Sequence, residues 1–172
     1  MFDCVYPCPC GYYGDSQKPC MCAHAVVTKY QKRISGPLLD RIDIHIEVPR
    51  VDYEKLSGDR MGESSESIRQ RVQAARNIQQ SRFTNSQFTN HQSTDIICNA
   101  DMRLGEIRRF CRLQDEGQRL MRAAMTQLNL SARAYHRILK LARTIADLAG
   151  SEEIQSVHLA EALQYRPKLM LI

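Results

Sequence analysis

The 172-residue sequence predicts a mainly α fold, in which the last elements of an α/β core precede a bundle of helices. A single run of alternating apolar and polar residues spans 42–48, which is the two-residue period of a strand. After residue 50 the apolar residues recur at three- and four-residue steps, the period of an amphipathic helix. One strand cannot form a sheet. Its partners are therefore expected upstream of Met1 or in another molecule.

The first fifty residues are predicted to form an irregular loop, a short helix, a turn and the strand. Residues 1–22 are rich in Cys, Pro, Gly and Tyr, a composition typical of loops. A short helix is predicted over 26–34. Pro37 can open a single turn, because the first helical position needs no N–H group. Pro49 is expected to end the strand, because proline cannot donate to a ladder of hydrogen bonds.

Five helices are predicted beyond residue 50. Ser64 or Ser65 can cap the first, because a serine side chain accepts a hydrogen bond from the backbone of the first turn. The other helices are predicted at 103–112, 115–128, 131–149 and 157–164, after a polar, turn-rich loop over 84–100. Ser131 and Ser156 are the predicted N-caps of the last two helices, and Gly150 is predicted to follow a C-cap. These patterns divide the chain into two predicted domains, 1–50 and 51–172.

Positive charge is concentrated in one part of the chain. The net charge is +5, and residues 101–150 hold 10 basic against 5 acidic side chains. Of the 24 basic residues 18 are arginine, whose planar guanidinium group binds phosphate through two hydrogen bonds. A solvated helix face would show the same excess, so the charge alone favours neither interpretation. No apolar run approaches the roughly 18 residues of a membrane span.

The cysteines cluster near the start of the chain. Five of the seven lie within the first 22 residues, which indicates a local metal or redox device in a reducing cytoplasm, not the disulfide framework of a secreted domain. Four of them form two Cys-x-Cys pairs nine residues apart: Cys8, Cys10, Cys20 and Cys22. Such a set can hold a structural zinc ion, stay reduced, or form a disulfide. Cys98 and Cys111 are predicted to be buried as small apolar residues.

Five blocks of sequence carry a family resemblance. They are Cys8-Pro-Cys-Gly-Tyr-Tyr-Gly-Asp15, Cys20-Met-Cys22, Ile34-Ser-Gly-Pro-Leu-Leu-Asp-Arg-Ile-Asp43, Leu130-Ser-Ala-Arg-Ala-Tyr-His-Arg-Ile-Leu139 and Ala142-Arg-Thr-Ile-Ala-Asp-Leu148. In this order they resemble the C-terminal part of the magnesium-chelatase-like AAA+ ATPases, within the ComM/YifB competence-protein branch. The resemblance implies that 1–50 ends the ATPase core and that 51–172 is its helical lid. It also implies that a Lon-protease-like domain and the Walker motifs come first.

The resemblance assigns roles to two arginines. Arg41 matches the arginine finger that reaches into the nucleotide site of a neighbouring subunit. Arg133 matches the lid arginine that contacts the γ-phosphate of ATP, called sensor 2. The family usually has Asn-Pro-Cys-Pro-Cys-Gly, whose Asn is sensor 1, whereas this sequence has Tyr6 at that place. A truncated or frame-disrupted gene would explain why residues 1–6 depart from the pattern.

The residues themselves are compatible with these roles. Arg133 follows the predicted cap by two residues, where an arginine and the free N–H groups of a helix start can bind a phosphate together. Arg137 and Lys140 lie on the same helical face, which is expected either to contact nucleic acid or to face solvent. For Arg41 the alternative is a salt bridge with Asp40 or Asp43.

The predicted function is that of a C-terminal ATPase fragment. The sequence has no G-x-x-x-x-G-K-[ST] loop, so the chain alone is expected to hydrolyse no ATP. In the intact protein the resemblance implies ATP and Mg²⁺, a ring that is expected to be hexameric, and remodelling of branched or single-stranded DNA or of a partner protein. The alternative is a free-standing basic helical module that binds nucleic acid through the arginines of 103–143, with an affinity that falls steeply with salt.

Overall fold

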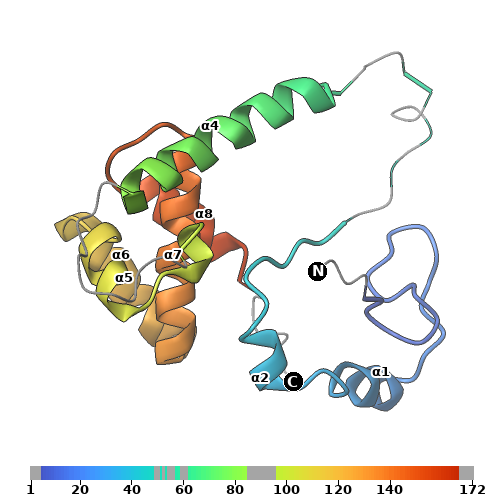
Figure 1. Ribbon diagram of the computed structural model, residues 1–172. Helices are drawn as coiled ribbons and strands as arrows, with labels where there is room; N and C mark the ends of the chain where they lie inside the picture. The colour runs from blue at the N-terminus through green and yellow to red at the C-terminus, as the bar shows by residue number, and fades with distance from the viewer. Residues whose placement is uncertain are drawn as a thin grey trace. The chain divides into compact units, whose positions relative to one another are not determined.

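The computed structural model describes residues 5–48, 51, 53, 57–58, 62–84 and 96–166. The chain divides into two compact units, one formed mainly by residues 1–60 and the other by residues 61–168. The sequence pattern placed this division at residue 50. Figure 1 shows the chain coloured from blue at its start to red at its end, with the helices labelled as below.

In the described part of the first unit, the short helices α1 and α2 follow an irregular loop. The helix α1 spans His24–Gln31, and the single turn α2 spans Gly36–Leu39. Helix α1 lies earlier in the chain than the predicted helix over 26–34. Pro37 lies in the first turn of α2, as predicted, because its missing N–H group is not needed there.

Residues 42–48 form no strand ladder with any residue that the structure describes. Their apolar side chains stay in contact with solvent: Ile44 is 47% exposed, Ile46 68% and Val48 84%. A strand needs a neighbour for its N–H and C=O groups. The two-residue alternation therefore remains a prediction of a strand that pairs with residues outside this chain.

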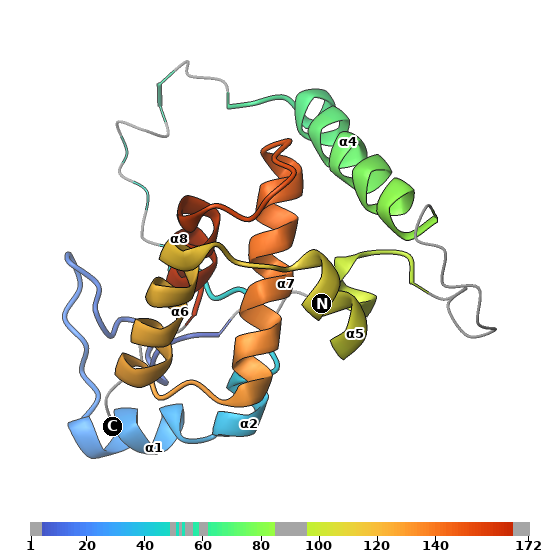
Figure 2. The ribbon, with the colours of Figure 1, turned by 90° about the vertical axis from the view of Figure 1, so that its left-hand side faces the viewer.

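The second unit is a helical bundle, which confirms the predicted mainly α fold. It consists of α4 (Ser65–Thr84), the 3₁₀ helix η1 (Asn99–Asp101), α5 (Leu104–Phe110), α6 (Asp115–Gln127), α7 (Ala132–Leu148) and α8 (Ser156–Gln164). Most of the predicted 84–100 loop, residues 85–95, lies outside the described residues. In Figure 2, α6 and α8 lie on one side of α7, and α4 and α5 lie on the other. No helix within the described ranges is long and apolar enough to cross a membrane.

Helix α7 supplies the centre of the core. Its inward face buries Ile138, Leu139, Ala142 and Ala146, which recur at one-, three- and four-residue steps as an amphipathic helix requires. The two alanines are small, which allows a close approach of neighbouring helices. Helix α7 packs against α8, α4, α5 and η1, and α6 packs against α8. A displacement of α7 would therefore carry much of the unit with it.

Both ends of α7 are closed by local hydrogen bonds, as predicted. At the start, the Ser131 side chain accepts a hydrogen bond of 3.1 Å from the Ala134 N–H group. At the end, Gly150 adopts a positive φ of 68°. The Gly150 N–H group donates to the Asp147 carbonyl, and the N–H group of the next residue donates to the Ala146 carbonyl. This pair of bonds is a Schellman motif, in which glycine avoids the strain of the left-handed conformation.

The start of α8 differs from the prediction. Ser156 is the first helical residue, and Gln155 is the N-cap. The side chain of His158, three residues into the helix, accepts a hydrogen bond of 3.2 Å from the Gln155 N–H group. An imidazole therefore satisfies the cap backbone here. The prediction that Ser156 caps this helix was wrong. At α4, by contrast, the Ser64 hydroxyl accepts from the Ser67 N–H group, as predicted.

Candidate functional site

Arg133 lies in the first turn of α7, and its side chain is exposed. Within the described part of the chain, its guanidinium group takes part in no hydrogen bond or ion pair. The helix dipole opposes a cation at this end by about 0.3–1 kcal/mol. A bound phosphate would offset this unfavourable interaction, because it attracts both the guanidinium group and the N–H groups of the first turn. The position is therefore suited to an anion.

The rest of the predicted basic face is less accessible than Arg133. Arg137 and Lys140 are both partly buried on the following turns of α7. The Lys140 ammonium group donates a hydrogen bond of 2.7 Å to the Ala100 carbonyl, which helps to hold η1 against α7. Of the three residues, Arg133 alone is exposed, so the accessibility of the basic face is not uniform.

Arg41 lies two residues after the end of α2 in the first unit, and its side chain is exposed. Its backbone N–H group donates to the Leu38 carbonyl at 2.9 Å, which extends the turn. All three charged residues of this segment are described, and Arg41 forms no salt bridge with Asp40 or Asp43. The simpler interpretation of this arginine, a local ion pair, is therefore not what the structure shows.

The four clustered cysteines converge on one point. Their sulfur atoms all lie within 4.8 Å of one another. Three of the Sγ–Sγ distances are 3.3 Å (Cys8 to Cys10), 3.7 Å (Cys8 to Cys20) and 3.5 Å (Cys10 to Cys20). A disulfide bond needs about 2.05 Å, so these thiols are not linked. Tetrahedral zinc at about 2.3 Å from each sulfur places the sulfurs about 3.8 Å apart, which is close to the observed arrangement.

Hydrogen bonds from the backbone act on the loop and on its thiols. Gly11, at a positive φ of 83°, donates its N–H group to the Cys8 carbonyl and turns the chain back. The Tyr12 N–H group and then the Cys8 side chain lower the pKa of the Cys10 thiol to about 6. The Cys22 N–H group also favours the thiolate of Cys20, but burial and the neighbouring thiols raise its pKa to about 12. The Cys10 N–H group likewise lowers the pKa of the Cys22 thiol, but the Cys10 side chain and burial raise it overall. It is therefore the convergence of the four sulfur atoms that fits a soft divalent ion.

The two remaining described cysteines differ from each other. Cys111 is buried in the core, as predicted, and burial raises the pKa of its thiol to about 12. Cys98 is only partly buried, and its thiol donates to the Asp101 carboxylate. The prediction of a buried apolar role was therefore wrong for Cys98, because a carboxylate lies within hydrogen-bond distance of the thiol.

A buried ionic cluster that the sequence pattern did not predict joins α4 to α7. Asp147 of α7 is buried, and its carboxylate pairs with both Arg82 and Arg143. The Asn99 side chain donates to the same carboxylate at 2.7 Å. The four-residue spacing of Arg143 and Asp147 could have indicated a pair on one helix. The third charge comes from 65 residues away, and no local pattern indicates it.

Two family profiles match the chain, and together they cover most of it. The profile described as magnesium chelatase, subunit ChlI C-terminal, matches residues 62–166. The profile described as magnesium chelatase, subunit ChlI, matches residues 1–56.

Curated bacterial proteins are similar over nearly the whole chain. Competence protein ComM of Haemophilus influenzae is 40% identical over 168 residues, which are 96% of this chain and 30% of that protein. The uncharacterized protein YifB of Escherichia coli is 38% identical over 161 residues, 93% of this chain and 29% of that protein. The uncharacterized protein Mb2921c of Mycobacterium bovis is 34% identical over 160 residues, which are 93% of this chain and 30% of that protein. The chain thus spans less than a third of the length of these relatives.

Proposed function

This chain belongs to the magnesium chelatase subunit ChlI family, and we propose that it forms the end of the ATPase core and the helical lid of a longer AAA+ ATPase. The first compact unit supplies the last core elements, and the second supplies the lid. ATP and Mg²⁺ are held mainly by residues outside this sequence, which has no phosphate-binding loop. The observation that carries the proposal is the exposed Arg133 without a described partner in the first turn of a capped helix.

Arg133 is proposed to act as sensor 2. Its guanidinium group and the N–H groups at the start of α7 converge on the γ-phosphate of ATP. Helix α7 packs against α8, α4, α5 and η1. A shift of Arg133 towards the phosphate therefore moves the helical unit as a body. Loss of the γ-phosphate releases it, which links hydrolysis to movement of the lid.

Arg41 is proposed to act as an arginine finger in a neighbouring subunit of a ring, by family resemblance a hexamer. An arginine finger neutralises the charge that develops on the transferring phosphoryl group, an effect of about 10³- to 10⁵-fold in rate. The exposed side chain without an ion pair to Asp40 or Asp43 supports this role.

A mixing experiment with a full-length family member that carries this segment tests the finger. Arg41→Ala subunits should lose ATP hydrolysis, and Arg33→Ala, an exposed arginine of the same unit, should not. Activity should partly return when Arg41→Ala subunits are mixed with subunits that retain Arg41 but have an inactivated Walker motif. Each kind of subunit then supplies what the other lacks. No recovery in mixed rings would contradict a role of Arg41 in trans.

We propose that the intact ATPase works in the cytoplasm and uses this cycle to remodel DNA, branched or single-stranded, or a partner protein. The second unit offers exposed arginines for contact with a nucleic-acid backbone, on α5, on α6 and between them: Arg108, Arg109, Arg112, Arg119 and Arg122. These residues equally suit the alternative function, a free-standing basic module that binds nucleic acid. Nucleic-acid binding by this chain alone, steeply weakened by salt and unaffected by nucleotide in the full-length protein, would favour the alternative.

The cysteine cluster is proposed to hold one structural zinc ion. The ion would bind Cys8, Cys10, Cys20 and Cys22 and cross-link the two Cys-x-Cys segments. In this way it would stabilise an irregular loop in which Cys8 is the one buried residue of the four.

A further inference from the structure

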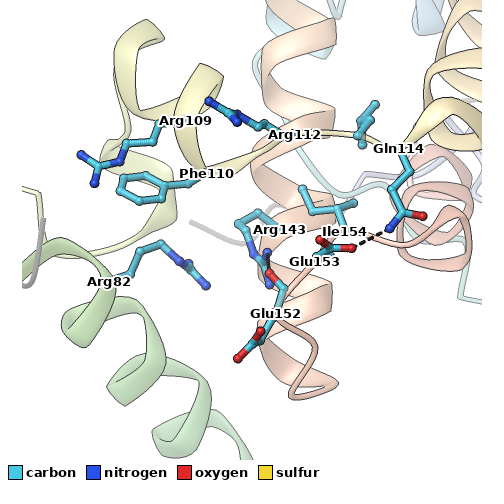
Figure 3. Close-up of a pocket in the computed structure, with 10 residues that line it drawn as sticks. Arg82, Arg109, Phe110, Arg112, Gln114, Arg143, Glu152, Glu153 and Ile154 are labelled. Carbon is cyan, nitrogen blue, oxygen red and sulfur yellow. Dashed lines mark hydrogen bonds between the residues drawn. The ribbon is translucent and has the colours of Figure 1, made fainter.

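The second unit contains a pocket that the proposed nucleotide contacts do not use. Its volume is about 310 Å³, and four of its ten lining residues are arginines: Arg82, Arg109, Arg112 and Arg143. They come from α4, from α5, from the segment that follows α5, and from α7. Arg143 lies ten residues along α7 from Arg133, so the pocket is distinct from the capped helix start. Figure 3 shows these side chains around the opening.

The floor of the pocket carries an excess of positive charge. Two guanidinium groups, those of Arg82 and Arg143, share the single buried carboxylate of Asp147. Burial lowers the pKa of Arg143, Asp147 opposes this effect, and the positive charge of Arg82 lowers the pKa further. A positive charge with less than one full counter-charge in a partly buried place is stabilised by an added anion.

The two floor arginines differ in what they can still donate. All three nitrogens of Arg143 already donate, to the Asp147 carboxylate and to the carbonyls of Ser151 and Glu152. Arg82 donates through both terminal nitrogens to Asn99 and Asp147, whereas its Nε–H group has no hydrogen-bond partner among the described residues. Arg82 can therefore donate to a ligand through Nε, and Arg143 contributes mainly its charge.

The rim adds two more guanidinium groups and an aromatic ring. Arg109 lies over the ring of Phe110, with its Cζ 5.1 Å from the ring centroid. Arg112 is exposed and forms no hydrogen bond or ion pair within the described residues. The acidic residues of the pocket, Glu152 and Glu153, lie beside Arg143 in Figure 3, and the Gln114 amide donates to the Glu153 carboxylate at 2.5 Å. The lining holds four arginines against these two glutamates, so its side chains carry a net positive charge.

We propose that this pocket binds a phosphate group, with Arg112 and Arg82 as its hydrogen-bond donors and the Arg143–Asp147 pair as its charged floor. Guanidinium groups match phosphate oxygens in geometry as well as in charge. The phosphate belongs either to a nucleic-acid backbone or to a free phosphate compound, and both present the same chemistry to the arginines. The inference does not depend on the proposed roles of Arg41 and Arg133.

The test measures the binding of pyrophosphate to the 172-residue chain by isothermal titration calorimetry at low salt. Saturable binding is expected, and Arg112→Gln should weaken it about tenfold or more, because a charge-assisted contact is lost. Arg76→Gln, an exposed arginine of α4 outside the pocket, is the matched control and should leave the affinity unchanged.

A second arm identifies the source of the phosphate. If single-stranded oligothymidylate displaces pyrophosphate, and if Arg112→Gln also weakens the binding of oligothymidylate, the pocket takes a nucleic-acid backbone. If only pyrophosphate responds to Arg112→Gln, the pocket takes a free phosphate compound. The proposal is overturned if pyrophosphate shows no saturable binding. It is also overturned if Arg112→Gln and Arg76→Gln change the affinity equally.

Discussion

Arg82 of α4 and Asp147 of α7 form a buried ion pair, although 65 residues separate them in the sequence. Helix α4 otherwise buries little: of its 20 residues, only Ala75 and Gln79 are buried. The ion pair and its bond to Asn99 therefore provide a specific attachment between α4 and the core helix of the lid. Arg143, which also pairs with Asp147, donates to the carbonyls of Ser151 and Glu152 and so links the cluster to the turn after α7.

Removal of the shared carboxylate should strongly destabilise the chain. In Asp147→Ala, two guanidinium groups in a partly buried place lose their common counter-charge. We expect the free energy of unfolding to fall by about 3–5 kcal/mol. Urea unfolding of the 172-residue chain, followed by circular dichroism, measures this change.

An exposed ion pair of the same chain is the control. Arg69 and Glu66 are paired at 2.9 Å, but their side chains are 72% and 65% exposed. Glu66→Ala should cost about 0–1 kcal/mol, because solvent screens the pair. Similar losses for Asp147→Ala and Glu66→Ala would show that the buried cluster contributes little to stability.

The two serines at the starts of α7 and α8 should respond differently to substitution. Ser131 accepts a hydrogen bond from the Ala134 N–H group, so Ser131→Ala should lower the free energy of unfolding by about 1 kcal/mol. Ser156 is the first helical residue and not the cap, so Ser156→Ala should be nearly neutral. Thermal or urea unfolding of both variants is the measurement. A larger loss for Ser156→Ala would contradict the observed cap.

The cysteine cluster should bind one zinc ion per chain. Elemental analysis of protein purified without chelator should find about one equivalent. Cys20→Ser should abolish this binding, and Cys98→Ser should preserve it, because Cys98 lies outside the cluster. A zinc content near zero in the unsubstituted chain, with all four thiols open to alkylation, would show that the four cysteines form no zinc site.

The periodic elements of this fold were predictable from the sequence, and the long-range contacts were not. Helices α6 and α7 follow the apolar spacing closely, and the cap at Ser131 follows from residue type. The cluster around Asp147 joins distant residues, so local pattern cannot indicate it. The alternation over 42–48 predicts a strand, but a strand also depends on neighbours, and the described residues supply none.

The cysteine cluster was partly predictable as well. The two Cys-x-Cys pairs identify the four thiols, but their spacing alone left zinc, reduced thiols and a disulfide open. The convergence of the sulfur atoms within 4.8 Å depends on the fold of the loop, including the positive φ of Gly11. For Arg41 and Arg133 the residues suggested suitable positions, whereas the specific roles came from the family resemblance.

The chain by itself should not hydrolyse ATP. It has no G-x-x-x-x-G-K-[ST] loop, whose backbone and lysine hold the β- and γ-phosphates. Phosphate release by the purified 172-residue chain should equal that of a buffer blank. Hydrolysis well above the blank that is lost in Arg133→Ala would overturn the interpretation of this segment as a core end and lid.

The central claim is that Arg133 contacts the γ-phosphate, and the most direct measurement is ATP hydrolysis by a full-length family member that carries this segment. Arg133→Ala should reduce the rate about tenfold to a hundredfold, because it removes a charge-assisted contact made mainly in the transition state. Arg137→Ala, a full turn farther along α7 and partly buried, should change the rate little. Equal losses of hydrolysis in the two variants would contradict the assignment of Arg133.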